Sequence, residues 1–226
     1  MTRSRVWSAP CVVAGLVLAL AGPLNAAVIL TLPTDPIVGV AAAPASSVSA
    51  LSVVGTLANT NNYPAAEAPL NCIDNNTATK YLNFAKTNVG ILERPGLGAS
   101  FLSGVRFATA NDSPERDPMQ IVIQGANGTD PLVGFLNTTW TTIYTGTSGL
   151  DTDPGRTTFG PEVDFPASPT DFVVYRVLVT SVRNATTANS VQFSEIQLIG
   201  TPVPEPVMLS LAGMALPLFW FRRRRA

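Results

Sequence analysis

The chain has 226 residues, with 14 lysines and arginines against 15 aspartates and glutamates, and a formal net charge of −1. It contains no histidine and 2 cysteines. These counts exclude histidine-dependent catalytic and zinc sites, and they leave too few cysteines for an all-cysteine zinc site or an iron–sulfur cluster. The nearly neutral charge gives no electrostatic reason to expect binding to nucleic acid.

Residues 1–27 have the pattern of a secretory signal peptide. Arg3 and Arg5 supply the positive start, the apolar stretch 11–21 follows, and Ala26 is a small residue at a plausible cleavage point for signal peptidase. The apolar stretch falls short of the roughly 20 residues that span a bilayer. The pattern therefore predicts export. An uncleaved anchor or a buried helix is the alternative.

Residues 28–58 are rich in alanine, valine, serine and proline, and Asp35 is their one charged residue. This composition suits a linker. The short apolar runs within it could equally form a strand that leads into the domain that follows.

Residues 59–200 consist of short β-branched runs separated by glycine, proline, asparagine and aspartate. The runs predict strands at 101–109, 119–124, 140–144, 172–182 and 191–199. In the first of these, one face is expected to carry Phe101, Val105, Phe107 and Thr109. No segment has a capped helical period of useful length, so the sequence predicts an all-β sandwich.

Charge and cysteine content describe this body further. With the two arginines of the signal, the four of the C-terminal tail and Glu205 set aside, the body keeps 8 basic and 14 acidic residues, a net charge of −6. Cys72 is its single cysteine, so it can form no internal disulfide. The neighbouring Ile73 favours a buried thiol over a reactive one.

Residues 201–226 form a three-part tail. Its parts are the motif Pro204-Glu205-Pro206, the apolar run 207–221 and the basic cluster Arg222-Arg223-Arg224-Arg225. The prolines end any strand, and the arginines would hold the end of the chain on the cytoplasmic side of a membrane. A plain membrane anchor is the alternative to the sorting signal described next.

This tail resembles the PEP-CTERM sorting signal of Gram-negative bacteria. The resemblance implies export, an intermediate in the inner membrane, processing by an exosortase, and delivery to the cell surface or extracellular matrix. Organisms with such proteins typically make exopolysaccharide.

The segment 71–84 is the most informative part of the body. Asp74, Asn76 and Thr79 place oxygen atoms in a turn-forming stretch between apolar positions. Such a loop can fold around a hard cation such as Ca²⁺, or it can be a turn that bonds its own backbone. The residues alone leave both interpretations open.

The same segment resembles the "A-I-D-G-D-x-x-T-x-W" loop of discoidin, or coagulation-factor type C, domains. Further similarities follow in the right order: 115–118 with 121–127 for a strand ending in "G-S-N", 140–143 for "W-T-x-I", 175–177 for a late core strand and 193–198 for the closing "x-x-E-I-x-L". The series covers nearly all of 59–200. It implies a galactose-binding-like jelly-roll β-sandwich, a fold found in many bacterial carbohydrate-binding modules.

The resemblance also implies one structural Ca²⁺ between this loop and the closing strand. The matching ligand positions are the carbonyl of Cys72, with Asp74, Asn76, Thr79 and Glu195. Two positions depart from the family pattern, since asparagine replaces glycine at Asn75 and aspartate at Asn76. The missing carboxylate should weaken binding of the cation.

Aromatic rings on loops are the natural platforms for sugars. The candidates are Tyr63, Tyr81, Phe84, Phe135 and Trp140. Tyr81 stands where the resembled family has a mostly buried tryptophan, and Phe135 is the hardest to explain as a core residue. Phe135 and Tyr81 are therefore named as candidate ligand contacts.

The sequence thus predicts an exported, non-enzymatic protein that binds extracellular polysaccharide. A structural matrix protein without a defined glycan ligand is the alternative. An exported hydrolase is disfavoured, because a glycosidase needs two carboxylates about 5–9.5 Å apart and the acidic residues here lie mostly in proline and glycine turns.

Overall fold

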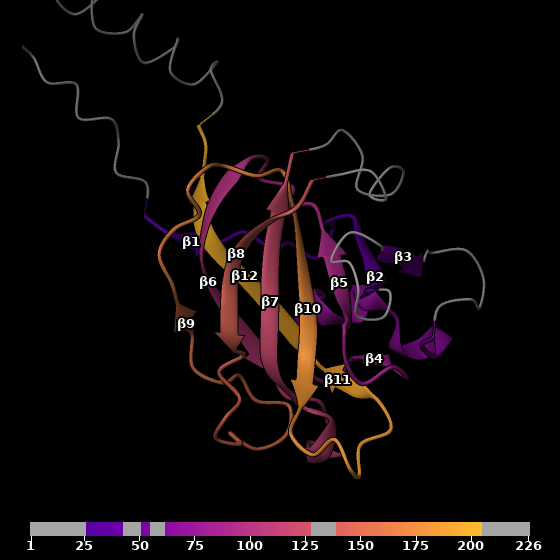
Figure 1. Cartoon of the computed structure of the whole chain (residues 1–226). Helices are drawn as coiled ribbons and strands as arrows, with labels where there is room; N and C mark the ends of the chain where they lie inside the picture. Colours follow the sequence, from indigo (N-terminus) through magenta and orange to yellow (C-terminus); the bar gives the residue numbers. More distant parts are fainter. Residues whose placement is uncertain (1–25, 43–50, 55–61, 128–138, 205–226) are drawn as a thin grey trace, which may run out of the picture.

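A computed structural model describes residues 26–42, 51–54, 62–127 and 139–204 (Figure 1). Most of the predicted signal peptide, Phe135, and the tail from Glu205 through the four arginines lie outside these ranges. Within them the helical elements are short 3-10 turns: η1 (Ala65–Glu67), η2 (Pro69–Cys72) and η3 (Pro114–Arg116). None of the helices in the described ranges is both long and apolar enough to cross a membrane.

Two antiparallel sheets make up the body of the described chain. The four-stranded sheet has the order β1 (Val28–Ile29), β12 (Glu195–Pro202), β6 (Ser100–Ala108) and β9 (Val163–Asp164). The six-stranded sheet has the order β3 (Leu51–Val54), β2 (Ile37–Ala42), β5 (Val89–Glu93), β10 (Val174–Val182), β7 (Pro118–Ala126) and β8 (Thr141–Thr147). A small two-stranded sheet pairs β4 (Tyr81–Asn83) with β11 (Val191–Phe193).

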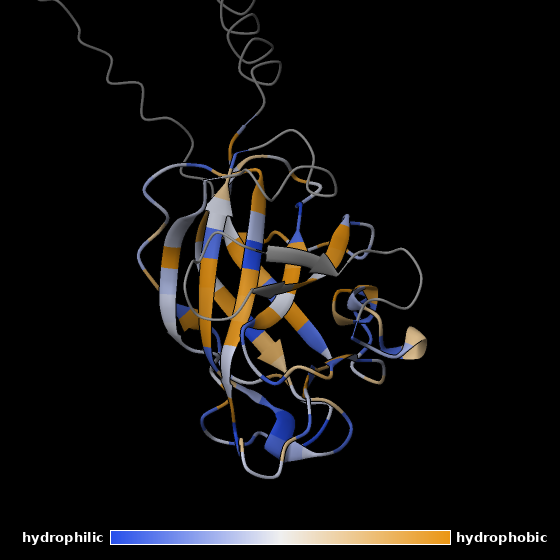
Figure 2. Ribbon diagram, turned by 45° about the vertical axis from the view of Figure 1, so that its right-hand side comes forward, coloured by the Kyte–Doolittle hydropathy of each residue, from blue (hydrophilic) through white to orange (hydrophobic). Residues whose placement is uncertain are grey.

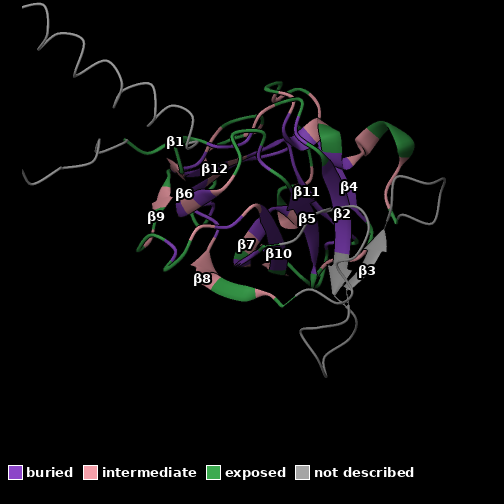
Figure 3. Ribbon diagram, turned by 90° about the horizontal axis from the view of Figure 1, so that it is seen from above, coloured by how far each residue is buried: buried purple, intermediate pink, exposed green. Residues whose placement is uncertain are grey.

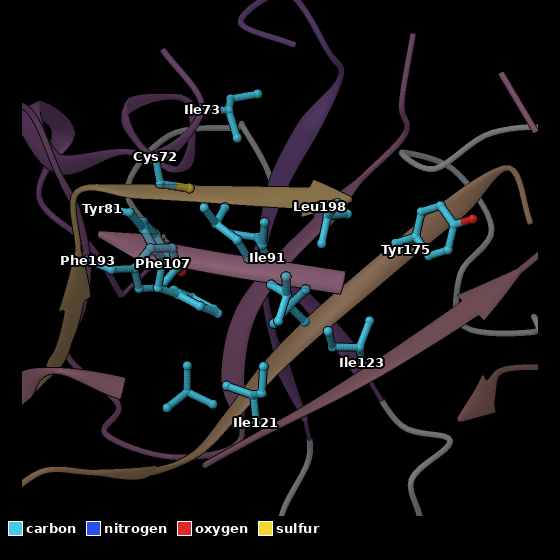
Figure 4. Close-up of a cluster of buried hydrophobic side chains, with 14 of the residues drawn as sticks. Cys72, Ile73, Tyr81, Ile91, Phe107, Ile121, Ile123, Tyr175, Phe193 and Leu198 are labelled. Carbon is cyan, nitrogen blue, oxygen red and sulfur yellow. The ribbon is translucent and has the colours of Figure 1, made fainter. Parts of the chain in front are cut away.

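The two large sheets face each other across one hydrophobic core. On β10, Tyr175, Val177 and Val179 point into it and are at most 2% exposed. Figure 4 shows Tyr175 in this layer together with Ile121 and Ile123 of β7. Seen from above, the buried colour fills the interior between the sheets and exposed loops surround it (Figure 3). The predicted β-sandwich is confirmed.

The outer face of the six-stranded sheet is covered too. Arg176 of β10 is fully buried, and its guanidinium lies 4.3 Å from the centre of the Trp140 ring. Val38 and Leu178 belong to a second apolar cluster against which Trp140 packs. β10 is therefore buried on both faces, and this explains its nearly continuous apolar sequence.

Of the two interpretations of residues 28–58, a linker or an entry strand, the structure shows strands in the part that it describes. β1 pairs with β12, and β2 pairs with β5 over five positions from Ile37 to Ala41. The domain therefore starts before residue 59, because these apolar strands extend the edges of both sheets. At the other boundary β12 continues to Pro202, two residues beyond the predicted limit.

The predicted face of the strand at 101–109 is partly wrong. Val105 and Phe107 are fully buried, as expected, but Leu102 takes the third core position and Phe101 is half-buried. The pairing of β6 with β12 shifts register between Ile199 and Gly200. After such an irregularity, the side chains that follow point to the opposite face of the sheet from the one that simple alternation predicts. The sequence pattern does not show where this happens.

The sandwich has two distinct ends, which follow from the strand registers. We define the terminal end as residues 26–36, 93–100, 126–127, 139–141, 168–174 and 199–204. The loop end comprises 84–88, 109–117, 148–160 and 183–190. In Figure 1 the terminal end lies at the top, and η3 marks the loop end at the bottom. The loop end is also the more hydrophilic one around η3 (Figure 2).

A buried acidic pair lies at the terminal end. Glu93, at the end of β5, is fully buried, and one of its oxygens accepts a hydrogen bond from the Thr31 hydroxyl at 3.4 Å. Asp35 accepts the backbone N–H groups of Leu32 and Gly96, both at 2.9 Å. Burial, reinforced by the negative charge of Asp35, raises the pKa of Glu93 well above its usual value.

We expect Glu93→Gln to raise the Tm at alkaline pH and to leave it nearly unchanged at acidic pH. Because the folded-state pKa of Glu93 lies above the unfolded-state value, its stabilising effect is complete below the unfolded pKa and is lost as the pH rises through the folded pKa. Glutamine keeps the neutral form at every pH. About 1 kcal/mol shifts the Tm of a domain of this size by roughly 2–4 °C, which scanning calorimetry resolves.

The control for this experiment is Glu115→Gln, at a half-buried glutamate of the loop end. Its Tm difference from the wild type should not grow with pH. A constant difference between Glu93→Gln and the wild type from about pH 4 to pH 9 would contradict the raised pKa of Glu93.

Candidate functional site

The loop that follows η2 contains a residue in the left-handed backbone region. Asn75 has a φ of 61°, the left-handed conformation that asparagine tolerates better than most residues. The replacement of the family's glycine by Asn75 therefore leaves the backbone of the loop intact. The structure describes the whole of this loop.

Asp74 organises the loop through both of its carboxylate oxygens. Oδ1 accepts the backbone N–H of Asn76 at 2.9 Å, and Oδ2 accepts the hydroxyl of Thr79 at 2.8 Å. The side-chain oxygen of Asn76 accepts the N–H of Ala78 at 3.1 Å. The side-chain oxygen of Asn76 is thus already hydrogen-bonded within the loop. Because it is also uncharged, the Asn76 side chain is a weaker cation ligand than the carboxylates of the predicted set.

Glu195, the first residue of β12, meets this loop across 119 positions of sequence. Its Oε1 accepts the N–H of Asn76 at 2.9 Å, and the residue is 1% exposed. Burial raises the pKa of Glu195 to about 8, and the neighbouring carboxyl group of Asp74 contributes to the rise. The sequence-predicted residues Asp74, Asn76, Thr79 and Glu195 are therefore brought together.

This donor set fits a hard cation in part. Two carboxyl groups in contact, one of them almost fully buried, must either share a proton or hold a positive ion. Among the described residues neither Asp74 nor Glu195 forms an ion pair with a basic side chain, and no group of three or more acidic, histidine or cysteine side chains is placed to hold a metal. Backbone carbonyls would have to supply the remaining ligands of a Ca²⁺ ion.

The thiol of Cys72 is directed to the backbone of η2. The thiol is fully buried and donates a hydrogen bond to the carbonyl of Pro69 at 3.0 Å. Burial, and then the nearby Glu93 and Glu195, raise the pKa of the Cys72 thiol. The predicted burial of the Cys72 side chain is confirmed.

Tyr81 is wrong as a ligand contact. Its ring is fully buried between Tyr63 and Phe193, with edge-to-face contacts at 5.9 and 5.5 Å between ring centres. Its hydroxyl donates to the carbonyl of Gly90 at 3.1 Å and accepts the side-chain amide of Asn83 at 3.0 Å. Figure 4 shows Tyr81 inside the core, where no sugar ring can reach it.

The other aromatic candidates differ in exposure. Trp140 is half-buried under Arg176, and Tyr63 is half-buried against Tyr81. Phe84, directly after β4, is 51% exposed. Phe135 lies outside the described residues, so its role stays a prediction. Phe84 is therefore the aromatic ring that the described structure presents most openly to solvent.

Phe84 lies among loops that are tied to one another. Two residues further on, the Lys86 ammonium donates to the carbonyl of Ala185 at 2.9 Å. The backbone N–H of Asn184 donates to the carbonyl of Glu115 at 3.0 Å. These bonds join segments 84–88, 109–117 and 183–190 into one surface.

Asp117 fixes the loop end from within. It is fully buried and accepts two hydrogen bonds from the guanidinium of Arg156, at 2.9 and 2.7 Å. The guanidinium of Arg183 lies 3.4 Å from the same carboxylate. Paired donors of this kind have fixed geometry, so the loops are held in one arrangement. The Asp117 pairing in turn holds the pKa of Arg156 above its usual value.

Basic side chains gather at this end. Of the eight basic residues of the body, four belong to it: Lys86, Arg116, Arg156 and Arg183. A fifth, Lys80, reaches it from β4's side, since its ammonium lies 2.7 Å from the carboxylate of Asp112. Phe84 was one of the five aromatic candidates in the sequence but was not chosen as a ligand contact, and the basic group was not predicted. The motif at 115–118 was the one sequence signal for a charged loop at this end. It contains two acidic residues, an arginine and a proline, and charges in such a loop can form ion pairs within the protein.

No family model and no curated protein matches the sequence. Among solved structures, the chain is similar to the family 32 carbohydrate-binding module of NanJ from Clostridium perfringens, solved in complex with galactose. The TM-score is 0.50 at 11% identity, over 77% of this chain and 99% of that one. The chain has the fold of a family 32 carbohydrate-binding module.

Two further similarities are weaker in their superposition. The module CpGH89CBM32-5 of Clostridium perfringens, in complex with GalNAc-β-1,3-galactose, has a TM-score of 0.49 at 8% identity, over 76% of this chain and 99% of that one. Chitosan-binding module 2 of a chitosanase/glucanase from Paenibacillus sp. IK-5, in complex with chitotriose, has a TM-score of 0.45 at 18% identity, over 75% and 98%. At such identities, similarity in structure concerns the fold alone.

Proposed function

We propose that this domain is a non-enzymatic module that binds polysaccharide at its loop end. The observation that carries the proposal is the exposed ring of Phe84, set among loops that internal ion pairs hold in place. A pyranose ring binds by placing its C–H face on an aromatic ring while rigid polar groups fix its hydroxyls. The galactose bound by the NanJ module, which shares the fold, supports this class of ligand.

Preorganisation is the main physical argument for this surface. Loops that are ordered before binding lose little conformational entropy when a ligand arrives. Asp117 and its two arginines supply that order without occupying the outer surface, since the carboxylate is fully buried. Lys86, two residues after Phe84, and the exposed Asn184, next to the residue that Lys86 binds, can donate hydrogen bonds to sugar hydroxyls.

We expect Phe84→Ala to weaken binding to extracellular polysaccharide by at least about tenfold, since a stacked aromatic ring contributes on the order of 1 kcal/mol or more beyond its buried area. Binding is measured by glycan array and by pull-down with the exopolysaccharide of the producing bacterium. Because Phe84 is 51% exposed, the substitution should leave the Tm unchanged.

Leu70→Ala is the matched control, because Leu70 has the same exposed fraction of 51% and lies outside the loop end. Phe135→Ala tests the other candidate, since the nearest described residues on either side of it, Asn127 and Thr139, lie at the terminal end. Loss of binding in Phe135→Ala alone would contradict the assignment of the site to Phe84. Absence of saturable binding to any polysaccharide would favour the alternative, a structural matrix protein without a defined glycan ligand.

We also propose that Asp74 and Glu195 hold one structural Ca²⁺, with Thr79, Asn76 and the Cys72 carbonyl as the further ligands. The supporting observation is the contact between two carboxyl groups, of which Glu195 is almost fully buried. The cation would join the loop to β12 and so brace the fold. It would take the place of the proton that otherwise keeps Glu195 neutral.

Added Ca²⁺ should therefore raise the Tm, and the rise should grow with pH. Without the cation, the raised pKa of about 8 means that stability from Glu195 is complete below the unfolded pKa and lost as the pH rises toward and through 8. The bound cation compensates for that loss. Thermal unfolding with Ca²⁺ and with a chelator, at about pH 6 and about pH 9, measures the effect.

Glu195→Gln should abolish the response to Ca²⁺, and Glu115→Gln should retain it. An identical Tm with Ca²⁺ and with chelator at both pH values would refute the site. In that case the loop is a turn that bonds its own backbone, the alternative that the residues had left open.

We propose, finally, that the chain is exported from a Gram-negative bacterium and sorted by an exosortase through the tail at 201–226. Signal peptidase would remove 1–27, and the apolar run 207–221 would hold an inner-membrane intermediate before delivery to the cell surface or matrix. The three-part tail in the sequence supports this proposal.

Intact-mass analysis of the secreted protein tests sorting. We expect the mature chain to lack the segment after Pro206, and a tail variant in which the four arginines are replaced by glutamine should accumulate unprocessed. Secreted protein that retains Arg222 to Arg225 would exclude processing at this tail and leave the plain anchor.

A further inference from the structure

The two ends of the described chain leave the sandwich side by side. Val28 of β1 pairs with Gly200 of β12, and the backbone N–H of Val203 donates to the carbonyl of Ala99 at 2.8 Å. Figure 1 shows both ends of the chain departing at the terminal end. Whatever residues 205–226 attach to, this end of the domain is the one that faces it.

Exposed apolar side chains concentrate at the same end. Six large hydrophobic residues are exposed within the described ranges, and four of them belong to the terminal end: Val28 at 42%, Ile29 at 46%, Leu97 at 41% and Val203 at 37%. The pairings of β1 and β6 with β12 bring their segments together. The remaining two, Leu70 and Phe84, lie elsewhere.

Charge is sparse at this end. Apart from the buried Asp35 and Glu93, the described residues of the terminal end carry two charged side chains, the exposed Arg94 and the half-buried Asp171. The loop end, by contrast, holds four of the body's eight basic residues and their acidic partners. A surface that is both apolar and poor in charge is costly to expose to water and inexpensive to place against lipid.

The connection to the apolar run 207–221 is short. Three residues, Pro204-Glu205-Pro206, separate Val203 from Val207. Even fully extended, four residue steps span at most about 14 Å. With the run inserted in a bilayer, the terminal end would stay within that distance of the lipid surface.

We propose that the terminal end, through Val28, Ile29, Leu97 and Val203, rests on the bilayer surface while the tail is inserted. The partner is a phospholipid surface, and the contact is apolar. This inference rests on the proposed membrane intermediate and adds an orientation to it. Nine residues of β6 span about 30 Å, so the loop end and Phe84 are held roughly that far from the membrane, facing outward.

Fluorescence quenching in vesicles tests the orientation. The full chain carries Cys11→Ser and one added cysteine, labelled with an environment-sensitive dye, while the buried Cys72 stays unlabelled. The labelled positions are Leu97→Cys at the terminal end, Thr186→Cys at the loop end and Ala212→Cys in the tail. The protein is reconstituted in two kinds of phosphatidylcholine vesicle. In one, lipid with a nitroxide near its headgroup quenches dyes at the lipid surface and reports on positions 97 and 186. In the other, lipid with a nitroxide on its acyl chain quenches dyes inside the bilayer and reports on position 212.

We expect the dye at position 97 to be quenched several-fold more than the dye at position 186. Replacement of Val28, Ile29 and Val203 by serine should reduce quenching at 97 to the level at 186, with an unchanged circular dichroism spectrum. Because all three side chains are exposed by more than a third, these substitutions should not prevent folding.

Two outcomes overturn the inference, and they are distinguishable. Equal quenching at 97 and 186, with strong quenching at 212, means that the tail inserts but the domain does not rest on the lipid. The orientation then fails, and the membrane intermediate stands. No quenching at 212 means that the tail does not insert, and both the intermediate and the orientation fail.

Discussion

The pairing of β12 with β6 is the interaction on which the two ends of this domain depend. β12 starts at Glu195, whose carboxyl group meets the Asp74 loop, and it ends at Pro202, one residue before the exposed Val203. Between these points it is hydrogen-bonded to β6 on one side and to β1 on the other. One strand of eight residues therefore fixes the distance between the loop that would hold a cation and the point where the tail begins.

Buried acidic groups recur in the structure, and their partners differ. Asp117 is paired with two arginines, and this pairing orders the loops. Glu195 faces another carboxyl group, and Glu93 faces Asp35; burial first, and the neighbouring carboxyl group second, raise the pKa of both glutamates. Burial of an unpaired charge is costly, which is why such groups take up a proton or a cation. The first kind of site gives rigidity, and the second gives sensitivity to pH.

Much of the sandwich could be predicted from the sequence, because alternation along the strands reflects which face meets the core. The strands at 119–124, 140–144, 172–182 and 191–199 all fall on observed strands. β5 was not predicted, since its pattern ends in Glu93, and the two-residue β9 is too short to carry a period. The burial of Asp117 depends on Arg156 and Arg183, which lie 39 or more positions away in the sequence. No local sequence pattern encodes this pairing, and none encodes the exposure of Phe84.

A single exposed ring among ordered loops sets a limit on how tightly one domain can hold a glycan. The described surface presents Phe84 as its one open aromatic ring, so each contact with a glycan at the proposed site would be shallow and would release readily. A polysaccharide, however, consists of repeating sugar units. When many copies of the domain share one surface, the first bound copy holds the polysaccharide close to the others, so each further copy would bind at a high effective concentration of sugar. Retention in a matrix would then come from the number of copies and from their common orientation. An arrangement in which the chain ends leave opposite Phe84 suits that requirement, because every copy attached through its tail presents the same end outward.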